Sequence, residues 1–300
     1  LREKQKRGSL LWVLDKTKTA MGARLLRSYV EQPLIDKAEI EKRQDAICEL
    51  NQHVITREEL REYLNPIYDL ERLITRVTYL TANPRDLIAF RSSIAMLPPI
   101  KSLLGDFHGE LLGEIREDMD TLEELCALID RAIMEEPPIS VRDGGLIKDG
   151  YNEDVDKYRK AKTEGKTWLA ELEAKEREKT GIKNLKIKYN KVFGYYLEVT
   201  NSYKDLVPDY FMRKQTLANA ERYITPELKE LEDKLVTLEY DLFCEVRSKI
   251  AAEVVRIQRT AKAVAGLDVF VSLALVADQN NYCRPKINEN GIIDIKGGRH

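Results

Sequence analysis

The stretch that decides the fold is KNLKIKYNKVFGYYLEVTNSYKDLVPDYFMRKQTLANAERYI, residues 183–224. Apolar and polar residues alternate in two segments of it, Leu185–Tyr189 and Tyr195–Val199. This alternation is typical of half-buried strands, and the glycine-containing loop between the segments predicts a hairpin. A third run at 210–216 and a short fourth at 222–224 would complete a small antiparallel sheet, because three or more strands are enough for independent stability.

Helical patterns flank the predicted sheet on both sides. A charged pattern begins after Asn152, the expected N-cap, and runs to Thr180, so this helix would be about 28 residues and ~40 Å long. On the return side, Thr225 and Pro226 predict a helix start, and Gly266 is the expected end roughly 40 residues later. Leucines recur three and four positions apart along this second helix, at Leu228, Leu231, Leu235, Leu238 and Leu242. Such a stripe needs a partner helix, so we expect the two helices to form an antiparallel coiled coil.

The remainder of the chain also predicts helices. From Gly8 to about Met134, apolar residues recur three or four positions apart, as at Leu10, Val13 and Leu14. The predicted fold class is therefore mainly α. We expect a multi-helix body with long antiparallel coiled-coil arms that carry a small antiparallel β-sheet.

The charge of the sheet segment differs from that of the whole chain. Residues 183–224 contain eight basic and four acidic side chains, whereas the chain has a net charge of −2. A local positive excess of this kind favours a polyanion partner, most often nucleic acid. The strongest signal is FMRKQT, residues 211–216, followed by Asn219 and Arg222. Cations beside amide and hydroxyl donors suit phosphate oxygens, and nothing in this pattern requires base readout.

Other residues of the segment have a simpler interpretation. Lys186 and Lys188 fit phosphate binding and a solvated strand face equally well, because lysines on exposed strands also block edge pairing. Most of the aromatic residues are expected to pack the small core of the sheet rather than to stack on bases. They are Tyr189, Phe193, Tyr195, Tyr196, Tyr203, Tyr210, Phe211 and Tyr223.

No catalytic or metal-binding pattern is found in the sequence. Gly165–Thr167 lacks the glycine that a P-loop requires five positions earlier, where Lys160 stands. The histidines His53, His108 and His300 are far apart in sequence and have no nucleophile or ligand pattern around them. The four cysteines form no paired motif, which favours a reducing, cytoplasmic setting. No uninterrupted apolar run approaches the ~20 residues of a membrane span.

Four stretches resemble the MutS family of bacterial DNA mismatch repair proteins, over essentially the whole chain. They are GSLLWVLDKTKTAMGARLLRSYVEQPLID at 8–36, YNKVFGYYLEVTNSY at 189–203, FMRKQTLANAERYITPELKELEDKL at 211–235 and GGRH at 297–300. The resemblance implies a lever (core) domain that is interrupted by an inserted clamp, with paired clamps closing over duplex DNA. It implies a first lever part at 1–149, the clamp with its arms at 150–257, a second lever part at 258–283 and the edge of an ATPase domain at 284–300.

Carried over position by position, the resemblance also implies the residues that face DNA. They are Asn190, Lys191, Arg213, Lys214, Gln215, Thr216, Asn219 and Arg222. Double-stranded DNA is the expected partner, held through its phosphate backbone, and no membrane partner is expected.

We expect the chain to be part of a longer protein, because it begins at Leu1 without an initiator methionine. The family's mismatch-reading module and nucleotide loop would then lie outside residues 1–300. We therefore expect no enzymatic activity and no cofactor in this chain, with ATP and Mg²⁺ bound elsewhere in the parent. The parent would be a homodimer and this chain a monomer. The alternative is a coiled-coil scaffold whose aromatic tip docks a protein partner, and it predicts association that tolerates salt and needs no duplex.

Overall fold

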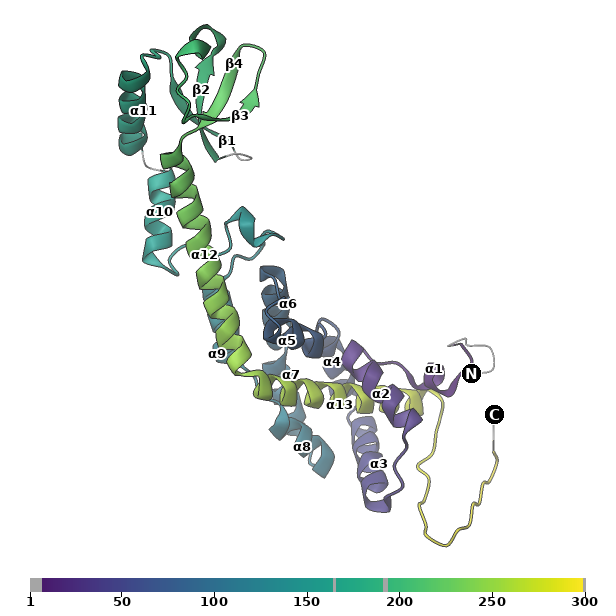
Figure 1. The fold of residues 1–300 in the computed structure, drawn as a ribbon. Helices are drawn as coiled ribbons and strands as arrows, with labels where there is room; N and C mark the ends of the chain where they lie inside the picture. The colour runs from purple at the N-terminus through teal and green to yellow at the C-terminus, as the bar shows by residue number, and fades with distance from the viewer. Residues whose placement is uncertain (1–6, 164–165, 191–193, 299–300) are drawn as a thin grey trace. The chain divides into compact units, whose positions relative to one another are not determined.

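The computed structural model describes residues 7–163, 166–190 and 194–298. Within these residues the chain is mainly helical, with a small antiparallel sheet (Figure 1). Two compact units can be distinguished. Unit 1 comprises the described residues of Leu1–Ala82, Asp86–Ile129 and Arg247–His300, and unit 2 comprises those of Asn83–Arg85 and Asp130–Val246. The domain boundaries predicted from the sequence stay predictions.

Unit 1 is a helical body built around one central helix, α13 (Val254–Gln279). This helix is buried along most of its length, from Ile257 to Val276, and it packs against α1, α2, α3, α4, α5 and α8. The helices that lie wholly or mostly in unit 1, besides α13, are α1 (Leu10–Leu14), α2 (Ala20–Glu31), α3 (Lys37–Gln52), α4 (Val54–Leu64), α5 (Leu70–Thr78), α6 (Pro84–Ile94), α7 (Leu97–Leu103), α8 (Glu110–Asp118) and α9 (Glu123–Ala132).

The expected end of the return helix at Gly266 is wrong. Helix α12 (Pro226–Ala252) ends earlier, and α13 begins at Val254 and continues through Gly266 to Gln279. The residues after Gly266 are buried in the core of unit 1; Leu267 and Val269, for example, have no exposed surface. Burial of this apolar run stabilises the helix by more than a glycine in its interior costs, which is about 1 kcal/mol relative to alanine.

Two helical stretches are apolar and long enough to cross a membrane when judged by length and composition alone. They are Pro84–Asp106 and Val254–Gln279. The first is divided in the structure into α6, α7 and a 3₁₀ turn (Leu104–Asp106). The second is α13, whose most apolar window is 83% buried. A buried core helix passes the same test, so these two stretches are weak evidence for a membrane span.

Unit 2 contains the sheet and the helices that lead to and from it. Its elements are a 3₁₀ turn (Val141–Asp143), α10 (Glu153–Thr163), α11 (Lys166–Thr180), β1 (Lys186–Asn190), β2 (Gly194–Thr200), a 3₁₀ helix (Asn201–Leu206), β3 (Met212–Thr216), β4 (Ala220–Ile224) and the part of α12 up to Val246. Asn152 caps α10 as predicted, since its Oδ1 accepts the backbone N–H of Val155 at 3.1 Å. The sheet has the order β1-β2-β4-β3, and all neighbouring strands are antiparallel. The predicted hairpin and small antiparallel sheet are confirmed.

One face of the sheet buries a small hydrophobic core. The cluster includes Leu197 and Tyr223 from the strands, Leu172 from α11 and Leu228 from α12. Of the aromatic residues expected in this core, Tyr195, Phe211 and Tyr223 belong to it and Tyr203 packs against it. Tyr196 is buried outside this cluster, beneath Arg222. Tyr189 and Tyr210 are exposed, and Phe193 lies outside the described residues.

The leucine stripe of α12 therefore contributes to two environments. Leu228 belongs to the sheet core and Leu242 is buried further along the helix, whereas Leu235 and Leu238 are only half-buried. The side chain of Leu231 is not described. The coiled-coil form of the arms stays a prediction.

Candidate nucleic-acid interface

A β-bulge at Lys214 sets the geometry of the candidate site. Arg213 lies opposite Tyr223, and Gln215 lies opposite Arg222, the preceding residue of β4. The extra residue in β3 is therefore Lys214, which has no partner in the register. In a regular strand, residues two apart share a face. Because of the bulge, Arg213 shares the face of Tyr223, while Gln215 shares the opposite face with Arg222.

Arg222 is held in place by three neighbours. Its Nη1 donates a hydrogen bond to Gln215 Oε1 at 2.7 Å, and its guanidinium carbon lies 4.6 Å from the centre of the Tyr196 ring. Its Nε is 3.7 Å from Glu198 Oε2, and the side chain is 19% exposed. A guanidinium fixed over an aromatic ring loses little further entropy when it binds an anion.

A second group of charges surrounds Glu221 on the other face. Lys204 Nζ lies 2.8 Å from Glu221 Oε1, and Arg213 Nη1 lies 3.8 Å from the same oxygen. The hydroxyl of Tyr223 donates a hydrogen bond to Glu221 Oε2. The hydrogen bond from Lys204, followed by that from Tyr223, lowers the pKa of Glu221 below its usual value. Lys204 was not among the residues predicted to face DNA; its contribution to the local positive charge was the only sequence signal for it.

The remaining predicted residues do not form one patch. Lys214 and Thr216 are exposed on β3, and Asn219 is exposed in the turn that joins β3 to β4. Asn190 is the last residue of β1, opposite Gly194 at the other end of β2. The seven residues of β2 separate the two ends by ~20 Å. The side chain of Asn190 is not described, and Lys191 lies outside the described residues.

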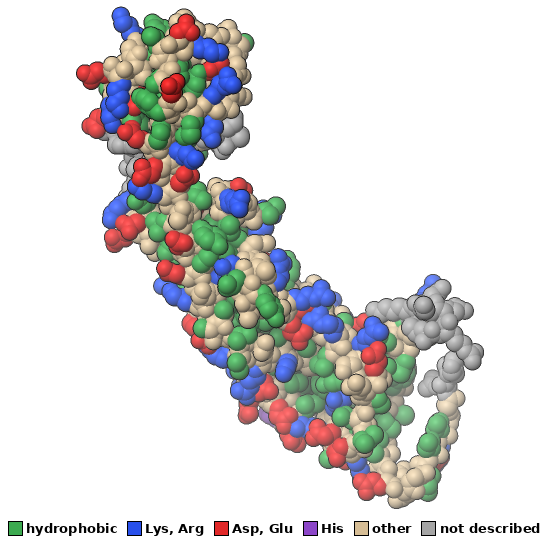
Figure 2. Space-filling view, in the orientation of Figure 1, with side chains coloured by type: hydrophobic (Ala, Val, Ile, Leu, Met, Phe, Trp, Pro, Cys, Tyr) green, Lys and Arg blue, Asp and Glu red, His purple; other side chains and the backbone are tan. Residues whose placement is uncertain are grey.

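Basic and acidic side chains are mixed on the surface of unit 2. Figure 2 shows Lys and Arg side chains over the sheet, with Asp and Glu among them. On the face that Figure 2 draws, basic side chains are therefore interspersed with acidic ones. Among the residues that the structure describes, no group of His, Cys, Asp or Glu side chains could hold a metal ion.

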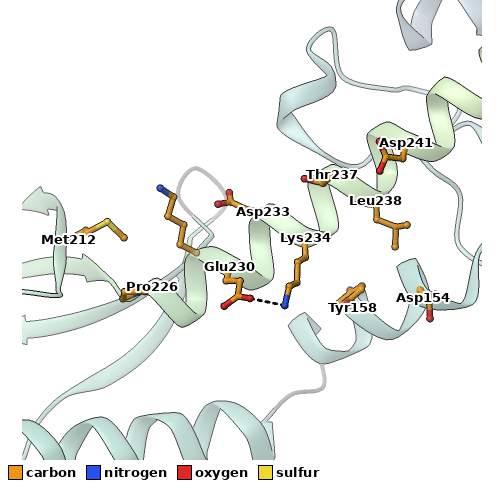
Figure 3. A pocket seen from close by; sticks show the side chains of 11 residues that line it. Asp154, Tyr158, Met212, Pro226, Glu230, Asp233, Lys234, Thr237, Leu238 and Asp241 are labelled. Atoms are coloured by element: carbon orange, nitrogen blue, oxygen red, sulfur yellow. Dashed lines mark ion pairs between the residues drawn. The ribbon is translucent and has the colours of Figure 1, made fainter.

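A groove of about 880 Å³ lies beside the sheet, between α10 and α12 (Figure 3). Leu238 points from α12 toward α10, where Tyr158 lies, and Glu230 pairs with Lys234 at 2.8 Å on the rim. Acidic side chains outnumber basic ones along it, since Asp154, Glu230, Asp233 and Asp241 line it beside Lys229 and Lys234. This groove lacks the cationic surplus of the sheet, so it is a poorer candidate for binding DNA.

Fold and site together define a class of protein: a helical body with an inserted module, in which helices carry a small sheet with exposed cations. The chain belongs to the MutS domain III family, which matches residues 1–274. It is 68% identical to the DNA mismatch repair protein MutS of Lachnoclostridium phytofermentans, over 100% of this chain and 33% of that protein. The proteins of the same name from Ruminiclostridium cellulolyticum and Caldanaerobacter subterraneus subsp. tengcongensis are 53% and 55% identical, again over 100% of this chain and 35% of each relative. The family resemblance seen in the sequence is confirmed, and the chain is a region of this type of repair protein.

The chain spans about one third of the length of the curated relatives that it matches.

Proposed function

We propose that the sheet of unit 2 is a clamp that grips duplex DNA through its phosphate backbone, without reading the bases. The helices of unit 1 and the arms would act as a lever that couples this grip to an ATPase domain elsewhere in the parent protein. The observation that carries the proposal is the bulged strand β3, which presents two adjacent cations, Arg213 and Lys214, to solvent. Family membership supports it, because the relatives are DNA mismatch repair proteins by name.

The geometry of these cations suits exchange with phosphate. The side chain of Arg213 is 62% exposed, and its only described ion pair is the 3.8 Å contact with Glu221. A contact of this length on an exposed side chain contributes little, so a phosphate oxygen can replace the carboxylate at small cost. Gln215, Thr216 and Asn219 add amide and hydroxyl donors along the same hairpin. Such groups commonly contact phosphate and carry no sequence information.

Duplex binding by the 300-residue chain tests this proposal. The affinity, measured by fluorescence anisotropy over a range of salt concentrations, should fall steeply with salt, because each phosphate contact adds about 0.9 to the log–log slope. The double variant Arg213→Glu/Lys214→Glu should nearly abolish binding while the far-UV circular dichroism stays the same. Lys249→Glu/Lys262→Glu is the matched control, since it makes the same charge change at exposed positions of unit 1.

Two results would count against the clamp. If Arg213→Glu/Lys214→Glu binds duplex as tightly as the unchanged chain, the site is wrong. If association tolerates salt and does not need a duplex, the protein-docking alternative is favoured instead.

The remaining assignments follow from the parent protein and are also part of this proposal. ATP and Mg²⁺ would be bound outside this chain, which would itself have no enzymatic activity or cofactor. The parent would be a cytoplasmic homodimer, and the isolated chain a monomer.

A further inference from the structure

One face of the sheet is polar and continuous across all four strands. The register places Lys186 opposite Glu198, Glu198 opposite Arg222, and Arg222 opposite Gln215. Lys188 lies two residues along β1 from Lys186 and therefore shares this face. The opposite face carries the main core of the sheet, and on this face Arg222 covers the buried ring of Tyr196. We call Lys186, Lys188, Gln215 and Arg222 the polar-face surface.

The charges on this face do not cancel. Glu198 is the single acidic residue among the described strand residues that share it, and its Oε1 pairs with Lys188 Nζ at 2.6 Å. Its Oε2 is 3.7 Å from Arg222 Nε. Lys186 is exposed and has no ion pair with any residue that the structure describes. A net positive face therefore remains after the internal pairs are made.

Protection of the sheet edge accounts for only part of the role of the β1 lysines. Strand β1 is at the edge of the sheet, where lysines often prevent pairing with another chain. Here α11 already covers that edge. The backbone N–H of Ile187 donates to Glu173 Oε2 at 2.8 Å, and Arg177 Nε donates to the carbonyl of Leu185 at 2.8 Å. These two backbone groups already have partners from α11, so blocking by a lysine is not needed at this part of β1.

We infer that the polar-face surface contacts the phosphates of the same duplex, so that the grip continues from Arg213 and Lys214 on the edge strand β3 over the face of Arg222 to β1. This inference rests on the proposed clamp function. Three strand spacings of ~4.8 Å make the surface ~14 Å wide. With one phosphate per ~3.4 Å of rise on each DNA strand, it spans about four phosphates. Arg222 is already fixed by Gln215 and Tyr196, so the flexible lysines are the side chains that would become ordered on binding.

The test is the salt dependence of duplex binding by the 300-residue chain with Lys186→Gln/Lys188→Gln. Two lost phosphate contacts should lower the log–log slope by about 1.8 and weaken binding at low salt. Lys249→Gln/Lys262→Gln is the control and should keep the slope of the unchanged chain. Light scattering without DNA measures self-association of Lys186→Gln/Lys188→Gln through the edge of β1. This self-association should be no greater than that of the unchanged chain. Acylation with a lysine-selective reagent gives a second readout in the unchanged chain: duplex should protect Lys186 and Lys188 but not Lys249.

The outcomes separate this inference from the proposed function. The inference is supported if the salt slope is lower in Lys186→Gln/Lys188→Gln but not in the control Lys249→Gln/Lys262→Gln, and if duplex protects both lysines from acylation. The clamp stands if the unchanged chain binds duplex and Arg213→Glu/Lys214→Glu does not. In that case, this inference is wrong if Lys186→Gln/Lys188→Gln keeps the salt slope of the unchanged chain and duplex protects neither lysine from acylation. If the unchanged chain does not bind duplex at low salt, the clamp and the polar-face surface both fail.

Discussion

At the scale of single residues, Asp268 joins the N-terminal segment to the central helix of unit 1. Its side chain is 1% exposed and accepts hydrogen bonds from the backbone N–H groups of Lys18 at 2.9 Å and Thr19 at 2.8 Å. Thr19 Oγ1 also donates to it, at 2.7 Å. Helix α2 comes so close that a Cβ on Gly22 would lie 2.2 Å from Asp268 Oδ2. Position 22 therefore has no room for a side chain, and only glycine fits there.

Replacing Gly22 with alanine should destabilise the protein. An alanine in a helix interior normally stabilises by about 1 kcal/mol relative to glycine, but here the added methyl would displace a buried and fully bonded carboxylate. Overpacking of this kind costs roughly 1–3 kcal/mol. Urea unfolding measures the change. Gly113→Ala in α8 is the control, because nothing lies within 4 Å of its added Cβ, and it should be neutral or stabilising. A Gly22→Ala protein as stable as Gly113→Ala would contradict this reading.

Tyr223 should make stability depend on pH in the alkaline range. Burial, followed by its hydrogen bond to Glu221, raises the pKa of Tyr223 to about 12. In the unfolded chain a tyrosine ionises near pH 10, so between about pH 10 and 12 the unfolded state loses its proton first. The stabilising contribution is therefore complete below about pH 10 and is lost as the pH rises toward 12.

The measurement compares the free energy of unfolding of Tyr223→Phe with that of the unchanged chain from pH 9 to 12. The difference between them should shrink with rising pH. Tyr189→Phe, at an exposed tyrosine of β1, is the control. A difference that stays constant across this range would show that Tyr223 ionises normally.

At the scale of elements, Glu239 joins three segments of unit 2. It lies on α12, is fully buried, and its Oε2 accepts the backbone N–H of Gly145 at 2.5 Å. Its Oε1 pairs with Arg159 of α10, whose Nη2 also donates to the carbonyl of Ile147 at 2.7 Å. Burial lowers the pKa of Arg159, but Asp149 and Glu239 outweigh this effect and raise it. The loop at 144–147 and α10 are thus fixed to α12 by one carboxylate.

Glu239→Gln should destabilise unit 2. It leaves the Arg159 cation without its buried partner, and such losses cost roughly 3–5 kcal/mol. We expect the lower end, because glutamine keeps one acceptor oxygen. Thermal unfolding followed at the helical band measures it. Glu230→Gln on the same helix breaks an exposed pair and should change stability far less. If the two substitutions lower the stability equally, the buried network stabilises unit 2 no more than an exposed ion pair does.

At the scale of the whole molecule, the two units have separate cores. Leu197→Ala removes a fully buried side chain from the sheet core, at a cost of roughly 2–5 kcal/mol. Hydrogen exchange should accelerate in β1–β4, while α13 keeps its protection. Val264→Ala in α13 should give the opposite pattern. If either substitution accelerates exchange equally in both units, the chain unfolds as one cooperative body.

The sequence by itself determined the local elements. Alternation along Leu185–Tyr189 and Tyr195–Val199 predicted the β1–β2 hairpin, because a period of two can satisfy only one apolar face of a strand. Asn152 marked the start of α10 through its side-chain oxygen, which is also a local interaction. Family membership and the cations Arg213 and Lys214 were likewise readable from contiguous residues.

The tertiary structure alone decided which neighbours these elements meet. It extended α13 past Gly266, because buried residues that follow the glycine are covered by helices distant in sequence. It placed Leu228 in the sheet core, together with Leu172 of α11. It also placed the bulge at Lys214, which puts Arg213 and Gln215 on opposite faces. An apolar or charged pattern reports which face of an element needs a partner, but register and coverage depend on contacts between segments far apart in the chain.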